Sequence, residues 1–282
     1  MSTTVPCRPT ASRRVRLPLA AGLGALLALA PAVPAGAQNQ TATCPNPSAP
    51  ARSATAGTPL IGTITADRLL GSAGDDDINA LPGDDCVTGG DGFDTVQGGI
   101  GGDTIFGEGT EDDLSGGAGD DRVYGGDGFD FVSGGLGADR LFGEAGPDDV
   151  SGGRGNDELS GGEGFDYLDG GIGSDELDGG DDRDDISGGG GGDTNDGGDG
   201  NDRISGGLSG DRLNGGDGND RIDGGDGRNR ISGGAGNDQI DAANGSTERI
   251  DCGAGRDVIR ADATDRLAGC ERVFRLALVD AG

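Results

Sequence analysis

Residues 89–124 read GGDGFDTVQ-GGIGGDTIF-GEGTEDDLS-GGAGDDRVY, which is four nine-residue segments in succession. They share the pattern G-G-x-G-x-D-x-U-x, in which U is an apolar residue. The same spacing runs without insertion from Gly62 to Asp241, giving 20 units in 180 residues (241 − 62 + 1). The sixth position is Asp in 19 of the 20 units, failing only at Asn229, and the eighth is Val, Ile or Leu in 19, failing only at Asn195. A short fixed period of this kind predicts a solenoid.

The nonapeptide resembles the RTX (hemolysin-type) calcium-binding repeat family over these 180 of 282 residues. The resemblance implies an all-β fold, a right-handed parallel β-roll (β-solenoid) of stacked 18-residue coils with two short parallel sheets. In each unit the G-G-x-G-x-D half would be a turn, because its glycines permit positive φ. The x-U-x half would be a short strand whose U side chain points into a narrow core. In the family, calcium lies between stacked loops, held by sixth-position carboxylates and backbone carbonyls.

Calcium (Ca²⁺) is therefore the expected cofactor, and the sixth-position aspartates are the expected ligands. Aspartates at i and i+18 would lie roughly 4.8 Å apart in stacked coils. Each such pair would repel by about 1 kcal/mol even in water, and a divalent ion between them reverses the sign. Turn formation alone also favours Asp in glycine-rich loops, but it does not require Asp in 19 of 20 units. The predicted metal ligands are Asp94, Asp103, Asp121, Asp130, Asp139, Asp157, Asp166, Asp175, Asp193, Asp202, Asp211, Asp220 and Asp238.

A few loops depart from the glycine pattern. The substituted positions are Glu108 and Glu144, which replace the second glycine, and Thr110 and Asp182, which replace the fourth. A non-glycine residue forced to positive φ costs on the order of 1–2 kcal/mol. We therefore expect weaker calcium binding at the loops of Asp112, Asp148 and Asp184 than at loops that keep every glycine.

The charge of the chain narrows the choice of partners. The formal net charge is −30, from 51 acidic and 21 basic residues, and there is no His and no Lys. Such a chain repels nucleic acid and anionic lipid and attracts cations, so no nucleic-acid partner is expected. Oxygen ligands without imidazole suit a hard ion such as Ca²⁺. One apolar residue in nine also makes a thin core, so folding needs a further source of stability.

Residues 1–37 resemble a secretory signal peptide. The basic part holds Arg8, Arg13, Arg14 and Arg16, an apolar run spans Leu17 to Val33, and residues 35–37 read AGA. The mature chain would then begin at Gln38 and be secreted, by either the general secretory or the twin-arginine route. A membrane anchor is the alternative, but prolines interrupt the apolar run, and no later stretch predicts a membrane span.

The remaining domain boundaries are predicted from where the nine-residue period starts and stops. We expect a linker and N-terminal cap over 38–61, the calcium-binding roll over 62–241, and an irregular last coil with a C-terminal cap over 242–282. Residues 242–251 form a ten-residue unit without a sixth-position Asp. Terminal units of a solenoid must be atypical, because they cover its open ends.

The cysteines and aromatic residues predict further contacts. Without Cys7 four cysteines remain, which allow three connectivities. Because the two ends of the stack lie far apart, only Cys44–Cys86 and Cys252–Cys270 are geometrically reasonable, and free buried thiols are the alternative.

Ninth-position aromatics spaced by 18 residues should stack as a ladder on an outer sheet face, either for cross-strand stabilisation or as a binding patch. They are Phe106, Tyr124 and Phe142.

These observations predict a secreted calcium-binding repeat protein with a structural or interaction role, which folds on extracellular calcium. The alternative is a non-catalytic calcium module of a secreted enzyme or toxin system. We expect no enzyme activity and no catalytic residue, because a chain without His has no Ser-His-Asp triad and no H-E-x-x-H motif. Calcium ions are the expected partners, with a cell-surface, matrix or glycan partner left open.

Overall fold

The computed structural model describes residues 51–55 and 58–276, and within them the chain folds as a parallel β-solenoid. The chain alternates between two 13-stranded sheets, one of odd-numbered and one of even-numbered strands. The first sheet contains β1 (Ala51–Ser53), β3 (Arg68–Leu70), β5 (Cys86–Asp91), β7 (Thr104–Gly109), β9 (Arg122–Asp127), β11 (Arg140–Ala145), β13 (Glu158–Glu163), β15 (Glu176–Asp181), β17 (Thr194–Asp199), β19 (Arg212–Asn214), β21 (Arg230–Ser232), β23 (Arg249–Asp251) and β25 (Arg266–Ala268). The second contains β2 (Leu60–Ile61), β4 (Asp77–Asn79), β6 (Thr95–Ile100), β8 (Asp113–Ala118), β10 (Phe131–Leu136), β12 (Asp149–Arg154), β14 (Tyr167–Ile172), β16 (Asp185–Ser187), β18 (Arg203–Ser205), β20 (Arg221–Asp223), β22 (Gln239–Ala242), β24 (Val258–Asp262) and β26 (Arg272–Leu276).

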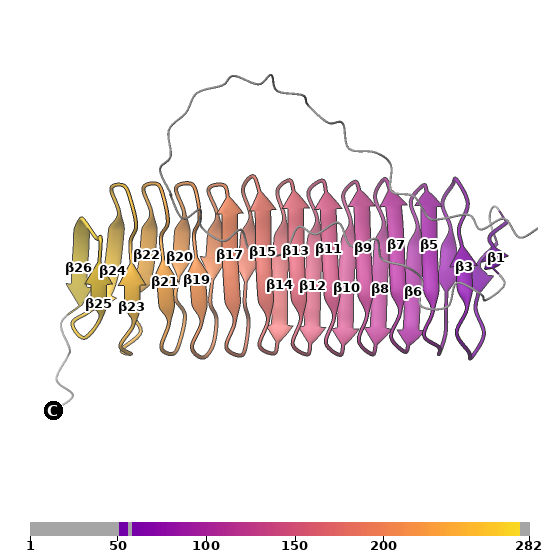
Figure 1. The fold of residues 1–282 in the computed structure, drawn as a ribbon, viewed down its shortest axis with the longest axis horizontal. Coiled ribbons are helices and arrows are strands. Elements are labelled where there is room, and N and C mark those ends of the chain that lie inside the picture. The colour runs from indigo at the N-terminus through magenta and orange to yellow at the C-terminus, as the bar shows by residue number, and fades with distance from the viewer. Residues whose placement is uncertain (1–50, 56–57, 277–282) are drawn as a thin grey trace, which may run out of the picture. The chain divides into compact units, whose positions relative to one another are not determined.

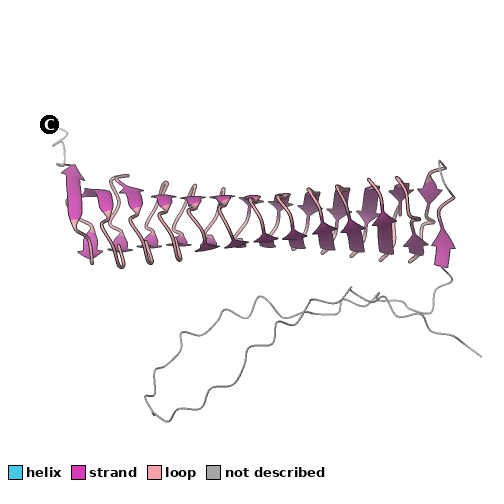
Figure 2. Ribbon diagram, turned by 90° about the horizontal axis from the view of Figure 1, so that it is seen from above, coloured by secondary structure: helices cyan, strands magenta, loops and turns pink. Residues whose placement is uncertain are grey.

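The register between neighbouring strands follows the sequence period. Val132 lies opposite Val150, and Leu141 opposite Leu159, each 18 residues apart. Two nonapeptides therefore make one coil, as predicted, and the two sheets face each other across the interior (Figure 2). The loops that follow odd strands lie along the upper edge in Figure 1, and those that follow even strands lie along the lower edge.

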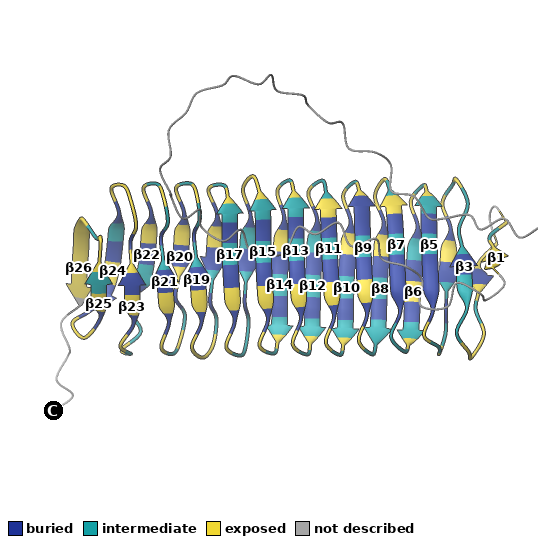
Figure 3. Ribbon diagram, viewed as in Figure 1, coloured by how far each residue is buried: buried dark blue, intermediate teal, exposed yellow. Residues whose placement is uncertain are grey.

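The core is a line of eighth-position side chains. Within the nonapeptide region these apolar residues are all almost completely buried, while their neighbours in each strand are more exposed (Figure 3). Alternation along a strand explains this division, since successive side chains point to opposite faces. Asn195 takes the same place between Leu177 and Leu213, and its polar side chain is buried as fully as theirs.

Strand pairing extends beyond residues 62–241 at both ends. At the N-terminal end, Leu60 lies opposite Ile78 with the usual 18-residue spacing. At the C-terminal end the spacing changes to 19 between Ile231 and Ile250, because the ten-residue unit carries one extra residue in its loop. The residues that the structure describes include no helix of the length and hydrophobicity that crossing a membrane requires.

Two expectations about side-chain contacts are confirmed. Cys252 and Cys270 form a disulfide with a Cα–Cα distance of 5.0 Å. Cys86 is also disulfide-bonded, and its expected partner Cys44 lies outside the described residues. The aromatic ladder is present on the sheet of odd strands, with stacked rings 5.0 Å apart for Phe106 and Tyr124 and 4.9 Å apart for Tyr124 and Phe142.

Candidate metal centres

The predicted ligands form two rows along the loop edges of the stack. Row 1, on the loops after odd strands, includes Asp94, Asp130, Asp166, Asp202, Asp220 and Asp238. Row 2, on the loops after even strands, includes Asp103, Asp121, Asp139, Asp157, Asp175, Asp193 and Asp211. All thirteen side chains are buried. The 18-residue coil therefore brings every sequence-predicted ligand next to others of its kind, and the thirteen divide between two edges rather than meeting at one site.

Each of these carboxylates has one oxygen engaged and one oxygen without a partner. The Oδ1 atom of Asp139 accepts a 2.9 Å hydrogen bond from the backbone N–H of Asp121, one coil earlier. The other twelve make the same bond, at 2.7–3.0 Å. The Oδ2 atoms of all thirteen are buried and accept no hydrogen bond. Buried polar atoms are usually hydrogen-bonded, so an unpartnered carboxylate oxygen repeated in loop after loop indicates a cation-binding position.

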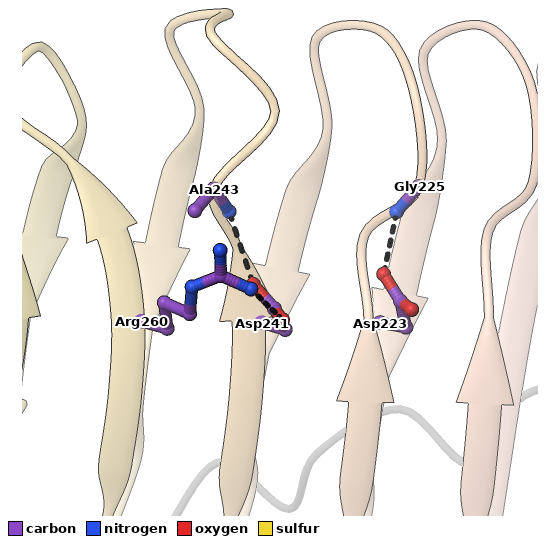
Figure 4. A network of polar contacts seen from close by, with 5 residues as sticks. All are labelled: Asp223, Gly225, Asp241, Ala243 and Arg260. Atoms are coloured by element: carbon purple, nitrogen blue, oxygen red, sulfur yellow. Dashed lines mark hydrogen bonds and ion pairs between the residues drawn. The ribbon is translucent and has the colours of Figure 1, made fainter. Parts of the chain in front are cut away.

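Aspartates on the outer faces show the opposite behaviour. Asp223 and Asp241 occupy ninth positions and accept hydrogen bonds from the backbone N–H groups of Gly225 (3.1 Å) and Ala243 (3.3 Å) (Figure 4). Asp241 also forms an ion pair with Arg260 at 2.9 Å. These two carboxylates are not buried, and both accept hydrogen bonds, so a buried oxygen without a partner is not a general feature of the acidic residues in this chain.

Burial raises the pKa of the thirteen predicted carboxyls above the usual 3.8. The pKa is about 6 for Asp139, about 7 for Asp121 and about 8 for Asp184. Loss of hydration is the main cause, and the charges of neighbouring aspartates in the same row add to it. The backbone hydrogen bond to each carboxylate lowers the pKa in part. Without a cation, the ionised form of these side chains is therefore disfavoured in the folded chain.

The first glycine of the unit leaves room for an ion beside each unpartnered oxygen. A methyl group added at Gly152 would lie 2.6 Å from Asp157 Oδ2 and 2.7 Å from the carbonyl oxygen of Gly170 in the next coil. A carboxylate and a carbonyl oxygen from consecutive coils thus face the same small space. Oxygen donors of these two kinds are what Ca²⁺ prefers. The residues present fit calcium, which would neutralise the buried carboxylates and join one coil to the next.

The loops that lack a glycine keep the same backbone shape. Glu108, Thr110, Glu144 and Asp182 all adopt positive φ, between 77° and 83°. The expectation that these residues are forced into the left-handed region is confirmed. Ser209, at a fourth position, has a φ of 87°. These loops therefore retain the geometry of the row at a cost in backbone strain.

Row 2 is interrupted at Asn229. Its Oδ1 accepts the hydrogen bond from Asp211 N–H at 2.9 Å, as an aspartate would. Its Nδ2 donates to the carbonyl oxygen of Gly224 at 2.6 Å. The Nδ2 of Asn229 thus lies where an aspartate would have its unpartnered Oδ2, and it donates a hydrogen bond there. A cation has no carboxylate oxygen to bind at this position.

Five further aspartates share the geometry of the thirteen. Each has Oδ1 bonded to a backbone N–H one coil earlier and a buried Oδ2 without a partner. Three lie in the loops with glycine replacements, one lies in the third unit, which begins at Ala80, and one lies in the unit that follows the ten-residue segment 242–251. They are Asp85, Asp112, Asp148, Asp184 and Asp257. The phase of the period, rather than the glycines, was the signal that would have identified the first four, while Asp257 lies 19 residues after Asp238 and is one residue out of phase.

The fold and the two rows define a cation-binding parallel β-solenoid. The family model described as "RTX calcium-binding nonapeptide repeat (4 copies)" matches residues 61–96, 88–123, 97–132, 124–159, 133–168, 160–194, 196–231 and 215–248. Together these matches cover 61–194 and 196–248, which is more than half of the chain. The chain therefore belongs to the RTX calcium-binding nonapeptide repeat family, and calcium is the ligand of its repeats.

Among solved structures, the chain is similar to a hyperactive, Ca²⁺-dependent, β-helical antifreeze protein from an Antarctic bacterium, known from an X-ray crystal structure. The two are 18% identical, with a TM-score of 0.31, over 81% of this chain and 80% of that one. No curated protein matches the chain.

Proposed function

We propose that this chain is a secreted calcium-binding repeat protein with a structural or interaction role, and that its roll folds when it meets extracellular calcium. The observation that supports this proposal is the buried, unpartnered Oδ2 of an aspartate in eighteen loops of the described region. An ionised carboxylate buried without a partner costs several kcal/mol. Folding without a cation would incur that cost once per loop, so calcium decides whether the roll forms.

The limited apolar core supports the same conclusion. Each coil contributes only two eighth-position side chains to the interior, while its loops require many glycines to be ordered. Glycine loses more backbone entropy on folding than any other residue. Calcium binding then supplies the missing folding free energy, as metal does in other small-core proteins.

We also propose that the chain is exported and meets its partner outside the cell. Residues 1–37 direct secretion, 38–61 link to the roll of 62–241, and 242–282 close its C-terminal end. Outside the cell, calcium is abundant and the calcium-loaded roll presents a long acidic surface. We assign the chain no catalytic role, since the buried carboxylates all serve the rows or the end of the stack. Its surface would serve a cell-surface, matrix or glycan partner.

Circular dichroism of residues 38–282 tests the folding step. Strand signal should be absent in excess chelator and should appear cooperatively as calcium is added, with Mg²⁺ at the same concentration as the control. Equal strand content with chelator and with calcium would refute the proposal. Fractionation of a culture expressing the full chain tests export, which requires the chain to lose residues 1–37 and leave the cell.

A further inference from the structure

Three acidic side chains outside the regular repeat meet at the C-terminal end of row 2. Glu248 precedes β23, Asp262 ends β24, and Asp265 precedes β25. One carboxylate oxygen from each lies within 4.8 Å of one from each of the others. The residues are only 1%, 7% and 6% exposed, respectively. In the part of the chain that the structure describes, this is the one group of three acidic or other ligand-type side chains so arranged.

Backbone hydrogen bonds fix two of the three carboxylates. Asp265 accepts from the N–H of Glu248 at 3.0 Å through Oδ1 and from the N–H of Asp262 at 2.6 Å through Oδ2. Asp262 accepts from Gly245 N–H at 2.6 Å through Oδ2. These bonds orient the two aspartates toward Glu248, so the cluster is built by the backbone of two consecutive loops.

Glu248 is the unsatisfied member of the cluster. Both its Oε1 and its Oε2 are buried and have no hydrogen-bond partner. Burial, together with Asp265 beside it, raises the pKa of Glu248 to about 7, although the nearby amide of Asn244 lowers the pKa in part. A side chain with two buried acceptors, directed at two further carboxylates, lacks a positive charge in its surroundings.

No basic side chain of the described region supplies that charge. The two ion pairs within it are Arg140–Glu158 and Arg260–Asp241, both elsewhere. Arg275 lies beside Asp262, but its Nη1 donates to the backbone carbonyls of Asp262 and Ala263, at 2.9 and 3.2 Å. Within the described residues, the three carboxylates therefore face one another without an ion pair to a basic side chain.

The cluster arises from the break in the period. The extra residue in 242–251 places Glu248 next in row 2 after Asn229, since Arg249 pairs with Arg230. The following loop is one residue shorter than usual, so Asp265 lies 17 residues after Glu248 rather than 18. Asp262 then takes the place of a second-position glycine. Neither loop has the G-G-x-G-x-D sequence, so the nonapeptide pattern does not predict this site.

We propose that Glu248, Asp262 and Asp265 bind one further calcium ion and thereby fasten the last coils to the stack. Three carboxylates offer more negative charge than a loop pair of the repeat, which favours a hard divalent cation. The disulfide Cys252–Cys270 joins the neighbouring loops of the same two coils. The ion and the disulfide would close the open C-terminal end from its two edges.

The test is to count ions by native mass spectrometry on residues 38–282 at saturating calcium. Glu248→Gln, which preserves the shape of the side chain, should bind one calcium ion fewer than the wild type. The matched control, Glu163→Gln, alters an exposed glutamate in a row 1 loop and should bind the full number. Circular dichroism with calcium should show that both variants remain folded.

A second readout separates binding from a purely structural role. If Glu248 holds calcium, Glu248→Gln should lower the thermal midpoint with calcium, and Asp262→Asn should do the same. If Glu248 is instead buried as a neutral acid, Gln should leave the midpoint unchanged or raise it, and the ion count should not change, which would overturn the inference. A wild type that binds no calcium at all would overturn the proposed function as well, so the two failures are distinguishable.

Discussion

The two carboxylate oxygens of a sixth-position aspartate have different roles. Oδ1 holds the backbone of the preceding coil, and Oδ2 is left for a cation, as at Asp139. An asparagine can perform the first role but not the second. Asn229 shows this directly, because its Nδ2 donates to Gly224 where an aspartate would present Oδ2. The identity of a single atom therefore separates a structural loop from a binding loop.

Asn229→Asp should restore row 2 at its interruption. The new Oδ2 would be buried without a partner, so the variant should bind one additional calcium ion by native mass spectrometry. In excess chelator the same change should further disfavour the fold, because it adds a buried charge. Asn201→Asp, which adds the same charge on an exposed loop residue, is the control and should do neither. An unchanged ion count would show that Asn229 does not interrupt the row.

Asn195 is the polar exception in the line of core side chains. Its Oδ1 is buried without a partner, while its Nδ2 donates to the carbonyl oxygen of Ser205 at 3.2 Å. That carbonyl also accepts from Gly188 N–H, so it stays satisfied if the asparagine is removed. A buried unsatisfied polar group costs about 1–3 kcal/mol. Asn195→Val should therefore raise the free energy of unfolding at saturating calcium by about 1 kcal/mol or more, measured by urea denaturation. A lower value would mean that the amide has a role in the fold that its contacts do not reveal.

In a loop and its adjoining strand, the backbone is strained where another residue replaces a glycine. β7 carries Glu108 at a φ of 83°, in register with Gly90 and Gly126 in the neighbouring strands. Both of these glycines have positive φ at no steric cost. The glutamate therefore follows a backbone path that its neighbours impose on it.

Glu108→Gly should relieve that strain. The expected gain in unfolding free energy at saturating calcium is about 1 kcal/mol, since left-handed φ costs a non-glycine residue about 1–2 kcal/mol and glycine is more flexible when unfolded. Calcium should also bind more tightly at the loop of Asp112. Glu163→Gly is the control, because Glu163 does not have positive φ, and it should lower stability. Similar effects of the two changes would argue against strain at Glu108.

Most of the structure of the loop and its adjoining strand can be predicted from the sequence, but part of it cannot. The period places Val132 over Val150 and the aromatic rings of Phe106 and Tyr124 in a stack, because both follow from an 18-residue coil. The same period could not reveal how the two oxygens of an aspartate differ, which depends on a hydrogen bond between coils. The cluster at Glu248 also escaped prediction, because one inserted and one deleted residue shift its members out of phase.

At the scale of the whole molecule, the rows act together. Five of the described row 1 aspartates alone, Asp94 to Asp166, each have a pKa of about 6 or 7. Because consecutive aspartates in a row are joined through their backbone bonds, a charge at one position affects the next. Calcium and protons compete for the same oxygens, so folding should depend on both.

In calcium-free solution, acid should partly replace calcium. The pKa values of Asp94, Asp112 and Asp184 are about 6, 7 and 8 in the folded chain, against 3.8 for an ordinary aspartate, so the folded state binds protons more tightly than the unfolded state. Protonation then stabilises the roll. This contribution is complete below about pH 4 and is lost as the pH rises through about 6 to 8. Far-UV circular dichroism of the calcium-stripped chain should show strand signal increasing from about pH 8 to about pH 5, with sedimentation to exclude aggregates, because the isoelectric point is about 4.1. With calcium present the trend should be opposite, since protons displace the ion and the calcium midpoint rises as the pH falls. If strand content without calcium does not respond to pH, buried carboxylate charge is not what keeps the calcium-free chain unfolded.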